Sequence, residues 1–155
     1  MADTSPDFTT GYSGEGAYGG AKLVHYERII DCSVAANNMT SGTSHALFDL
    51  PAGLIHMATY VDPITLEGGT ATIDIGVTGT DVDSLIDGAD LNSATTWRSG
   101  DASTAEVLSM QGAEHGNMLL ADTTFSILAN NTLDAAVFRV VSVWLDMRAT
   151  VADPA

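Results

Sequence analysis

The stretch LFDLPAGLIHMATYVDPITLEGGTATIDIGV, residues 47–77, determines the fold class of this chain. Its last part alternates apolar and polar side chains, with one predicted face of Ala71, Ile73, Ile75 and Val77 and another of Thr70, Thr72 and Asp74. Alternation with a period of two predicts a β-strand that buries one face. Residues 51–53, Pro-Ala-Gly, predict a turn, because proline is preset for one. The stretch therefore predicts three strands joined by turns.

Similar strand-like runs occur along most of the chain. They cover residues 22–33, 45–50, 54–61, 70–77, 105–110, 117–121, 123–128 and 135–150. In the run 54–61, the alternation places Ile55, Met57 and Val61 on one face and His56 and Tyr60 on the other. About eight strands with regularly spaced turns predict an all-β, antiparallel β-sandwich of jelly-roll-like type.

The last run is apolar on both predicted faces. Phe138, Val140 and Trp144 fall on one face, whereas the other face carries Val141, Val143, Leu145 and Met147. A strand that is apolar on both faces is typical of a fully covered position in a sheet. We therefore expect residues 135–150 to form a strand in the middle of a two-layer stack.

The composition divides the chain into two parts. Residues 1–20 are rich in Gly, Ser, Thr and Asp, and a segment of this composition cannot build a core. We expect an extended N-terminal arm with Phe8, Tyr12 and Tyr18 as anchors for a partner. Residues 21–155 are expected to form a single β-sandwich domain with a long acidic loop at 78–103, in which residues 81–88 could form one helical turn closed by Gly88.

The charge balance limits the class of partner. The chain has 20 acidic and 5 basic residues, for a formal net charge of −15. Such a surface repels phosphate backbones and anionic lipids, so we expect neither nucleic acid nor membrane as a partner. Solubility is the favoured explanation, ahead of a basic partner or cations held between subunits. The N-terminal residues have no signal-peptide pattern, so we expect synthesis and folding in a cytoplasm.

Residues able to carry catalysis are sparse and scattered. Cys32 is the single cysteine and is expected to be a small buried hydrophobe rather than a catalytic thiol. His45 and His56 lie on different predicted strands and could meet in space, but no two histidines have a metal-ligand spacing. The chain contains neither a Gly-x-Ser-x-Gly elbow nor a P-loop. We predict no enzymatic activity and no cofactor.

The acidic segment suggests two weaker sites. Its carboxylates Asp81, Asp83, Asp87 and Asp90 are weak calcium candidates, because calcium prefers hard oxygen ligands. Leu85 and Ile86 break the EF-hand pattern, so a solvated loop with an Asx-turn is favoured. Trp97 and Arg98 are the best candidate contact pair, since both residue types are enriched at binding hot spots. A tryptophan that caps the core is an equally good interpretation of Trp97.

Residues 47–92 resemble a pattern of small β-rich virion structural proteins of tailed bacteriophages. The matching motifs are LPAG at 50–53, TLEGGTATIDIG at 65–76 and the segment 85–90. The resemblance implies a multimeric virion protein with a β-sandwich or jelly-roll fold, of the capsid decoration (cement) or head-fibre type. It implies no catalytic residues.

These observations lead to one favoured function and two alternatives. We expect a non-enzymatic protein that decorates and stabilises a phage capsid, as a homotrimer in contact with the major capsid protein. The arm is the expected main anchor and the 78–103 segment the second contact. One alternative is a carbohydrate- or receptor-binding β-sandwich of a phage fibre or tail, with an exposed platform of Trp97 and Asp101. The other is a cupin-like metalloenzyme.

Overall fold

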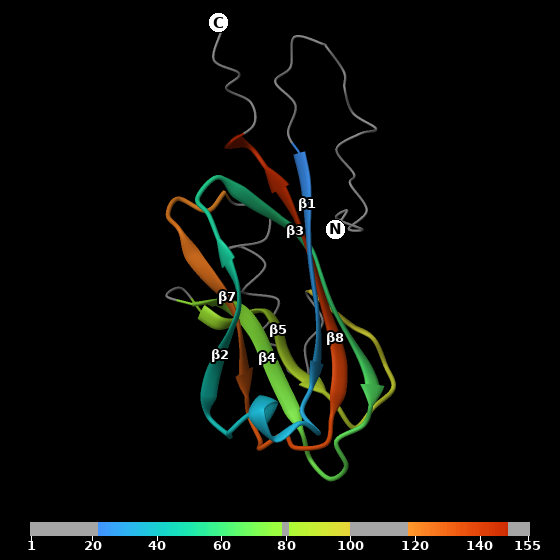
Figure 1. Ribbon diagram of the computed structural model, residues 1–155. Helices are drawn as coiled ribbons and strands as arrows, with labels where there is room; N and C mark the ends of the chain where they lie inside the picture. The colour runs from blue at the N-terminus through green and yellow to red at the C-terminus, as the bar shows by residue number, and fades with distance from the viewer. Residues whose placement is uncertain (1–21, 79–80, 100–117, 149–155) are drawn as a thin grey trace, which may run out of the picture.

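Two four-stranded β-sheets pack face to face in the computed structural model (Figure 1). The structure describes residues 22–78, 81–99 and 118–148, and the side chains of residues 78, 81 and 82 are outside that description. The elements are β1 (Lys22–Asp31), the 3-10 helix η1 (Ala35–Asn37), β2 (Thr43–Leu50), β3 (Leu54–Thr65), β4 (Thr72–Thr78), β5 (Asp81–Asp90), β6 (Trp97–Arg98), β7 (Thr123–Ala129) and β8 (Val137–Asp146). The predicted arm at 1–20 and the predicted strand at 105–110 lie outside the described residues.

The strand order is that of a jelly roll. The first sheet has the order β1-β8-β3-β6 and the second sheet has the order β2-β7-β4-β5. The antiparallel pairs β1·β8, β2·β7, β3·β6 and β4·β5 show that the chain folds back on itself as one long hairpin with its tip at β4–β5. Wrapping this hairpin into two sheets gives the jelly roll. The predicted all-β, antiparallel sandwich with eight strands is therefore confirmed.

Apolar side chains from both inner faces form the core between the sheets. The largest fully buried ones are Trp144, Phe125 and Phe138. On β4 the predicted inward face is confirmed, because Ile73, Ile75 and Val77 are all buried. β8 lies in the middle of the first sheet, between β1 and β3, as predicted. Only its inner face reaches the core, so the expectation of two covered faces was wrong.

Asp74 on β4 was expected to face solvent, but it is only 6% exposed. Its carboxylate accepts hydrogen bonds from the backbone N–H of Gly88 and from Nδ2 of Asn130, both at 2.8 Å. Burial raises the pKa of Asp74, and these two hydrogen bonds only partly oppose that rise. The acidic side chain is tolerated because both donors satisfy it.

The Pro-Ala-Gly turn at 51–53 carries the chain from β2 in the second sheet to β3 in the first. Gly53 has φ of +90°, and a Cβ atom there would lie 2.6 Å from Cγ of Arg148. The left-handed backbone favours glycine here, and a Cβ atom would also force the Arg148 side chain to move. The predicted turn is confirmed, and it explains the glycine of the LPAG motif.

The predicted faces of β3 were wrong in its first half. His56 is buried at 1% exposure, whereas Met57 is 46% exposed. The register between β3 and β8 shifts between His56 and Ala58, so Met57 is the additional residue of a β-bulge. A bulge changes the phase of the alternation, which turns His56 toward the core.

The predicted loop at 78–103 was also wrong, because residues 81–90 form strand β5 and no helical turn. Two register shifts against β4 place the consecutive residues Leu85 and Ile86 both in the core. Gly88, with φ of +71°, lies in the irregular part of this strand. These irregularities remove the period of two by which a strand is recognised in a sequence.

Candidate interaction surfaces

Trp97 and Arg98 form the two-residue strand β6 at the edge of the first sheet, where they pair with Val61 and Tyr60 of β3. Because neighbours on a strand alternate, Trp97 shares the inward side of buried Val61, and Arg98 shares the outward side of Tyr60. Trp97 is half-buried, packs against the core and donates from Nε1 to the carbonyl of Asp90 at 3.3 Å. The structure thus separates the predicted pair and leaves Arg98 outward.

The other predicted contact residues, Phe8, Tyr12 and Tyr18, lie outside the described residues. Asp101, the predicted partner of Trp97 in a glycan platform, also lies outside them. Trp97 itself is half-buried against the core and donates to the Asp90 carbonyl, which agrees with the interpretation of a tryptophan that caps the core. No observation therefore favours the carbohydrate-binding alternative.

The calcium candidates lie along the extended strand β5, which spaces them out instead of gathering them in a loop. Asp90 accepts a hydrogen bond at 2.8 Å from the backbone N–H of Asn92, which is the Asx-turn expected from the sequence. Asp83 and Asp87 are half-buried, and the side chain of Asp81 is outside the description. Among residues 22–78, 81–99 and 118–148, no group of three or more His, Cys, Asp or Glu side chains could hold a metal ion.

His56 belongs to a buried polar network on the inner face of the first sheet. Its Nε2 lies 2.8 Å from Oγ1 of Thr59, which in turn lies 2.9 Å from Oγ of Ser142. Trp144 donates from Nε1 to the same Ser142 oxygen at 2.8 Å, and its ring meets the His56 ring edge-on. The network connects core residues, and His45 lies in the opposite sheet.

Cys32 is fully buried, as predicted. Burial of the thiol, together with the nearby charges of Glu67, Asp31 and Asp134, raises its pKa to about 11. Because the thiolate is the nucleophilic form, a thiol with this pKa is unreactive at neutral pH.

We predict that iodoacetamide at pH 8 leaves native Cys32 unmodified and modifies it fully in unfolding concentrations of urea. Mass spectrometry of the intact chain measures the label. A Cys32→Ala, Ser44→Cys variant is the matched control, since residue 44 is exposed on β2 and its thiol should react in the native state. Rapid, complete labelling of native Cys32 would contradict the prediction.

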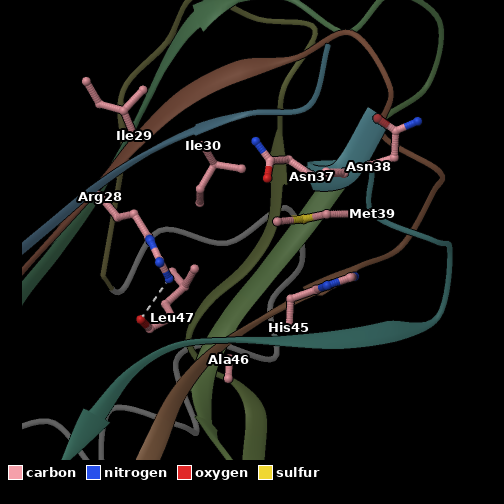
Figure 2. A pocket seen from close by; sticks show the side chains of 10 residues that line it. Arg28, Ile29, Ile30, Asn37, Asn38, Met39, His45, Ala46 and Leu47 are labelled. Atoms are coloured by element: carbon pink, nitrogen blue, oxygen red, sulfur yellow. Dashed lines mark hydrogen bonds between the residues drawn. The ribbon is translucent and has the colours of Figure 1, made fainter. Parts of the chain in front are cut away.

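A cavity of about 310 Å³ opens between the edge strands β1 and β2 (Figure 2). Its lining residues are Arg28, Ile29, Ile30, Ala36, Asn37, Asn38, Met39, His45, Ala46 and Leu47. Arg28 donates to the Leu47 carbonyl at 3.1 Å, which links the two edges, and Asn37 donates to the Asp31 carbonyl at 3.1 Å. The cavity is a gap between two edges in which Arg28 and Asn37 bond within the fold, whereas the buried Nε2 of His45 has no hydrogen-bond partner among the described residues.

The outer face of the first sheet is apolar over its middle. Strand pairing gives rows of Leu23, Leu145 and Ile55, of His25, Val143 and Ala58, of Glu27, Val141 and Tyr60, and of Ile29, Arg139 and Asp62. Leu23 is 49% exposed and Ile29 is 61% exposed. The residues of β8 in these rows, Val141, Val143 and Leu145, are half-buried. Sequence reasoning missed this surface because it assigned that side of β8 to the core.

At one end of this face, Arg139 lies between two carboxylates of opposite charge. Arg139 donates from Nε to Oδ2 of Asp62 at 3.0 Å and lies 3.7 Å from Glu27. Burial alone would raise the pKa of Asp62, but the hydrogen bond and charge of Arg139 hold it below its usual value. Asp62 is therefore a carboxylate at neutral pH and stays paired with Arg139.

The outer face of the second sheet has a different character. Its rows contain Ser44, Leu128 and Asp74, and then Ala46, Ser126 and Gly76. Apart from Leu128 these side chains are small or polar, and Asp74 and Ser126 are only 6% and 1% exposed, so this face offers little open apolar surface. The contrast identifies the outer face of the first sheet as the candidate contact surface.

Glu67 has a structural role that the sequence did not reveal. It follows β3, and its carboxylate accepts hydrogen bonds from the backbone N–H groups of Asp134, Ala135 and Ala136 at 3.0, 3.0 and 2.6 Å. Gly68 and Gly69 follow with φ of +85° and +76°. The EGG motif is thus a structural clamp between the β3–β4 connection and the β7–β8 connection.

The chain was compared with known proteins. No protein-family model matches it, and no curated protein sequence matches it. A chain from the capsid of Ralstonia phage GP4 is 11% identical, with a TM-score of 0.54 over 83% of this chain and 86% of that chain. A chain from the capsid asymmetric unit of cyanophage Pam1 is 14% identical, with a TM-score of 0.53 over 94% of each chain. At these identities the similarity shows a shared fold, the jelly roll.

Helices are nearly absent from the described part of the chain. Within it, no helix has the length and apolar character that crossing a membrane requires.

Proposed function

We propose that this protein is a non-enzymatic structural protein of a bacteriophage particle that decorates the capsid and stabilises it through protein–protein contacts. The proposal rests on one observation. The chain has a jelly-roll fold that is similar to chains from two phage capsids over most of their lengths. A fold alone does not define a function. The apolar outer face of the first sheet gives the proposal a contact surface.

The proposed mechanism is passive. A protein that binds the assembled shell but not its free subunits stabilises the shell by linkage, in proportion to how far its concentration exceeds its dissociation constant. The partners are the major capsid protein and further copies of this chain, arranged as a homotrimer. The protein would be made in the host cytoplasm and reside in the virion.

Two parts of the chain are proposed to make the contacts. The arm, residues 1–20, would supply the aromatic anchors Phe8, Tyr12 and Tyr18, because large aromatic residues dominate binding energy at interfaces. Arg98 would supply a second contact, since it is exposed at the edge of the first sheet.

The test is co-sedimentation of the purified protein with capsids of the phage that encodes it. We expect the full chain to sediment with capsids, and replacement of Phe8, Tyr12 and Tyr18 by alanine to weaken binding by about 100-fold. The matched control replaces Thr9, Thr10 and Ser13 of the same arm by alanine and should bind like the full chain. Undiminished binding of a chain without residues 1–20 would overturn the arm as anchor. Failure of the full chain to sediment would overturn capsid decoration.

A further inference from the structure

The outer face of the first sheet carries more apolar surface than the fold uses. The core is complete between the two sheets, yet Val141, Val143 and Leu145 line the opposite side of β8. Leu23 on one flank and Met57 on the other add side chains that are 49% and 46% exposed. A contiguous apolar patch of this kind marks an interaction site in a water-soluble protein.

We propose that this face is the surface through which copies of the chain associate with one another. The inference deepens the proposed function, since it assigns the self-contact that a homotrimer needs. Two other surfaces fit less well. The cavity between β1 and β2 is concave and lined in part by Arg28, Asn37 and His45, and on the outer face of the second sheet Asp74 and Ser126 are buried.

Charge favours a second copy as the occupant. The rows of this face contain the carboxylates Glu27 and Asp62 and the guanidinium of Arg139, and Arg98 lies beside Tyr60 at the sheet edge. The face is therefore close to electrically balanced, so the net charge of −15 resides elsewhere on the chain. Two such acidic chains repel each other least where they meet through a neutral face, and a face with both signs is complementary to itself.

The face has the size of the central part of such a contact. Three strands across and seven residues along, from Leu23 to Ile29, measure roughly 14 by 23 Å at the usual spacings of a β-sheet. This plane covers roughly 320 Å², a little under half of the about 800 Å² that each partner contributes to a standard interface, so side chains bordering the face would supply the rest. Three copies that turn this face toward a common axis would each border two neighbours.

The test is the mass of the protein in solution, measured by multi-angle light scattering and by sedimentation at several concentrations. We expect the unmodified protein to be an oligomer and Val143→Glu to be a monomer, with association weakened at least about 100-fold, because an unpaired carboxylate would be buried at the centre of the contact. Leu23→Glu, at an exposed position of the same face, should have the same effect with less risk to folding. Ala46→Glu, on the outer face of the second sheet, is the matched control and should keep the oligomer.

Each outcome decides a separate question. A monomeric unmodified protein, or an unchanged mass of both Val143→Glu and Leu23→Glu, would overturn the inference. Circular dichroism and thermal unfolding establish that each variant is folded. Co-sedimentation of the folded, monomeric Leu23→Glu variant with capsids tests capsid binding apart from self-association, so failure of one proposal is distinguishable from failure of the other.

Discussion

Replacement of Glu67 by glutamine is expected to lower the free energy of unfolding by about 3 kcal/mol. The carboxylate accepts three backbone N–H groups, from Asp134, Ala135 and Ala136, and so holds the β7–β8 connection against the end of β3. A glutamine side chain has one acceptor oxygen, and its NH₂ group would face backbone donors. Urea unfolding followed by circular dichroism measures the loss. Asp49→Asn, which removes one negative charge at an exposed position of β2, is the control and should change stability by less than about 0.5 kcal/mol.

The effect of Glu67 should depend on pH in a defined direction. Burial raises the pKa of the carboxyl, but the three backbone donors outweigh burial and hold it below its ordinary value of 4.5. Because the folded-state pKa is lowered, the stabilisation is fully present above pH 4.5 and is lost as pH falls through the folded-state pKa. The difference between the unmodified protein and Glu67→Gln should therefore shrink in acid. A difference that is constant down to pH 2, or absent at pH 7, would rule out the clamp.

The second large effect is expected at Ser142, which lies in the buried network of His56, Thr59 and Trp144. Ser142→Ala should lower the free energy of unfolding by about 2 to 4 kcal/mol, because the Trp144 N–H and the Thr59 hydroxyl both lose the Ser142 oxygen in a site without access to water. Ser44→Ala, at an exposed strand position, is the control and should be nearly neutral. Thermal and urea unfolding give the two values.

A double-mutant cycle distinguishes a network from two independent contacts. Thr59→Val removes the hydroxyl that links His56 to Ser142. If the groups act together, the double variant should cost less than the sum of the two single variants by about 1 kcal/mol, since a partner left unsatisfied by one change is removed by the other. Strict additivity would show that Thr59 and Ser142 contribute independently.

The regular strands were predictable from the sequence and the irregular ones were not. β4 was recognised because its apolar residues recur strictly at every second position, and β8 because its apolar character exceeds that of any edge strand. β3 was recognised as a strand, but the bulge at Met57 reversed the faces predicted for the residues that precede it. β5 was missed because its register shifts place Leu85 and Ile86 side by side in the core. A bulge is set by the partner strand, which one segment of sequence does not reveal.

The contact surface was hidden for a related reason. Val141, Val143 and Leu145 were recognised as apolar, but a sequence cannot distinguish a strand covered by a second layer of its own chain from one covered by another copy. Glu67 was seen within a motif, yet its three partners lie 67 to 69 residues along the chain. Trp97 had two equal interpretations, and the structure places its ring against the core. Contacts between residues that are far apart in the sequence depend on the strand topology, which the sequence pattern does not give.

From the concentric strand pairing we also expect an order of folding. β4 and β5 are separated by residues 79–80 alone, whereas β1 and β8 are separated by more than a hundred residues, so loop closure costs the least entropy at the tip and the most at the outermost pair. The outer face of the first sheet is centred on that outermost pair, since its rows run across β1, β8 and β3. We therefore expect the outer face of the first sheet to be completed last. A chain that is still folding would not yet present this face to other copies of the chain. Completion of the monomer fold would therefore precede self-association.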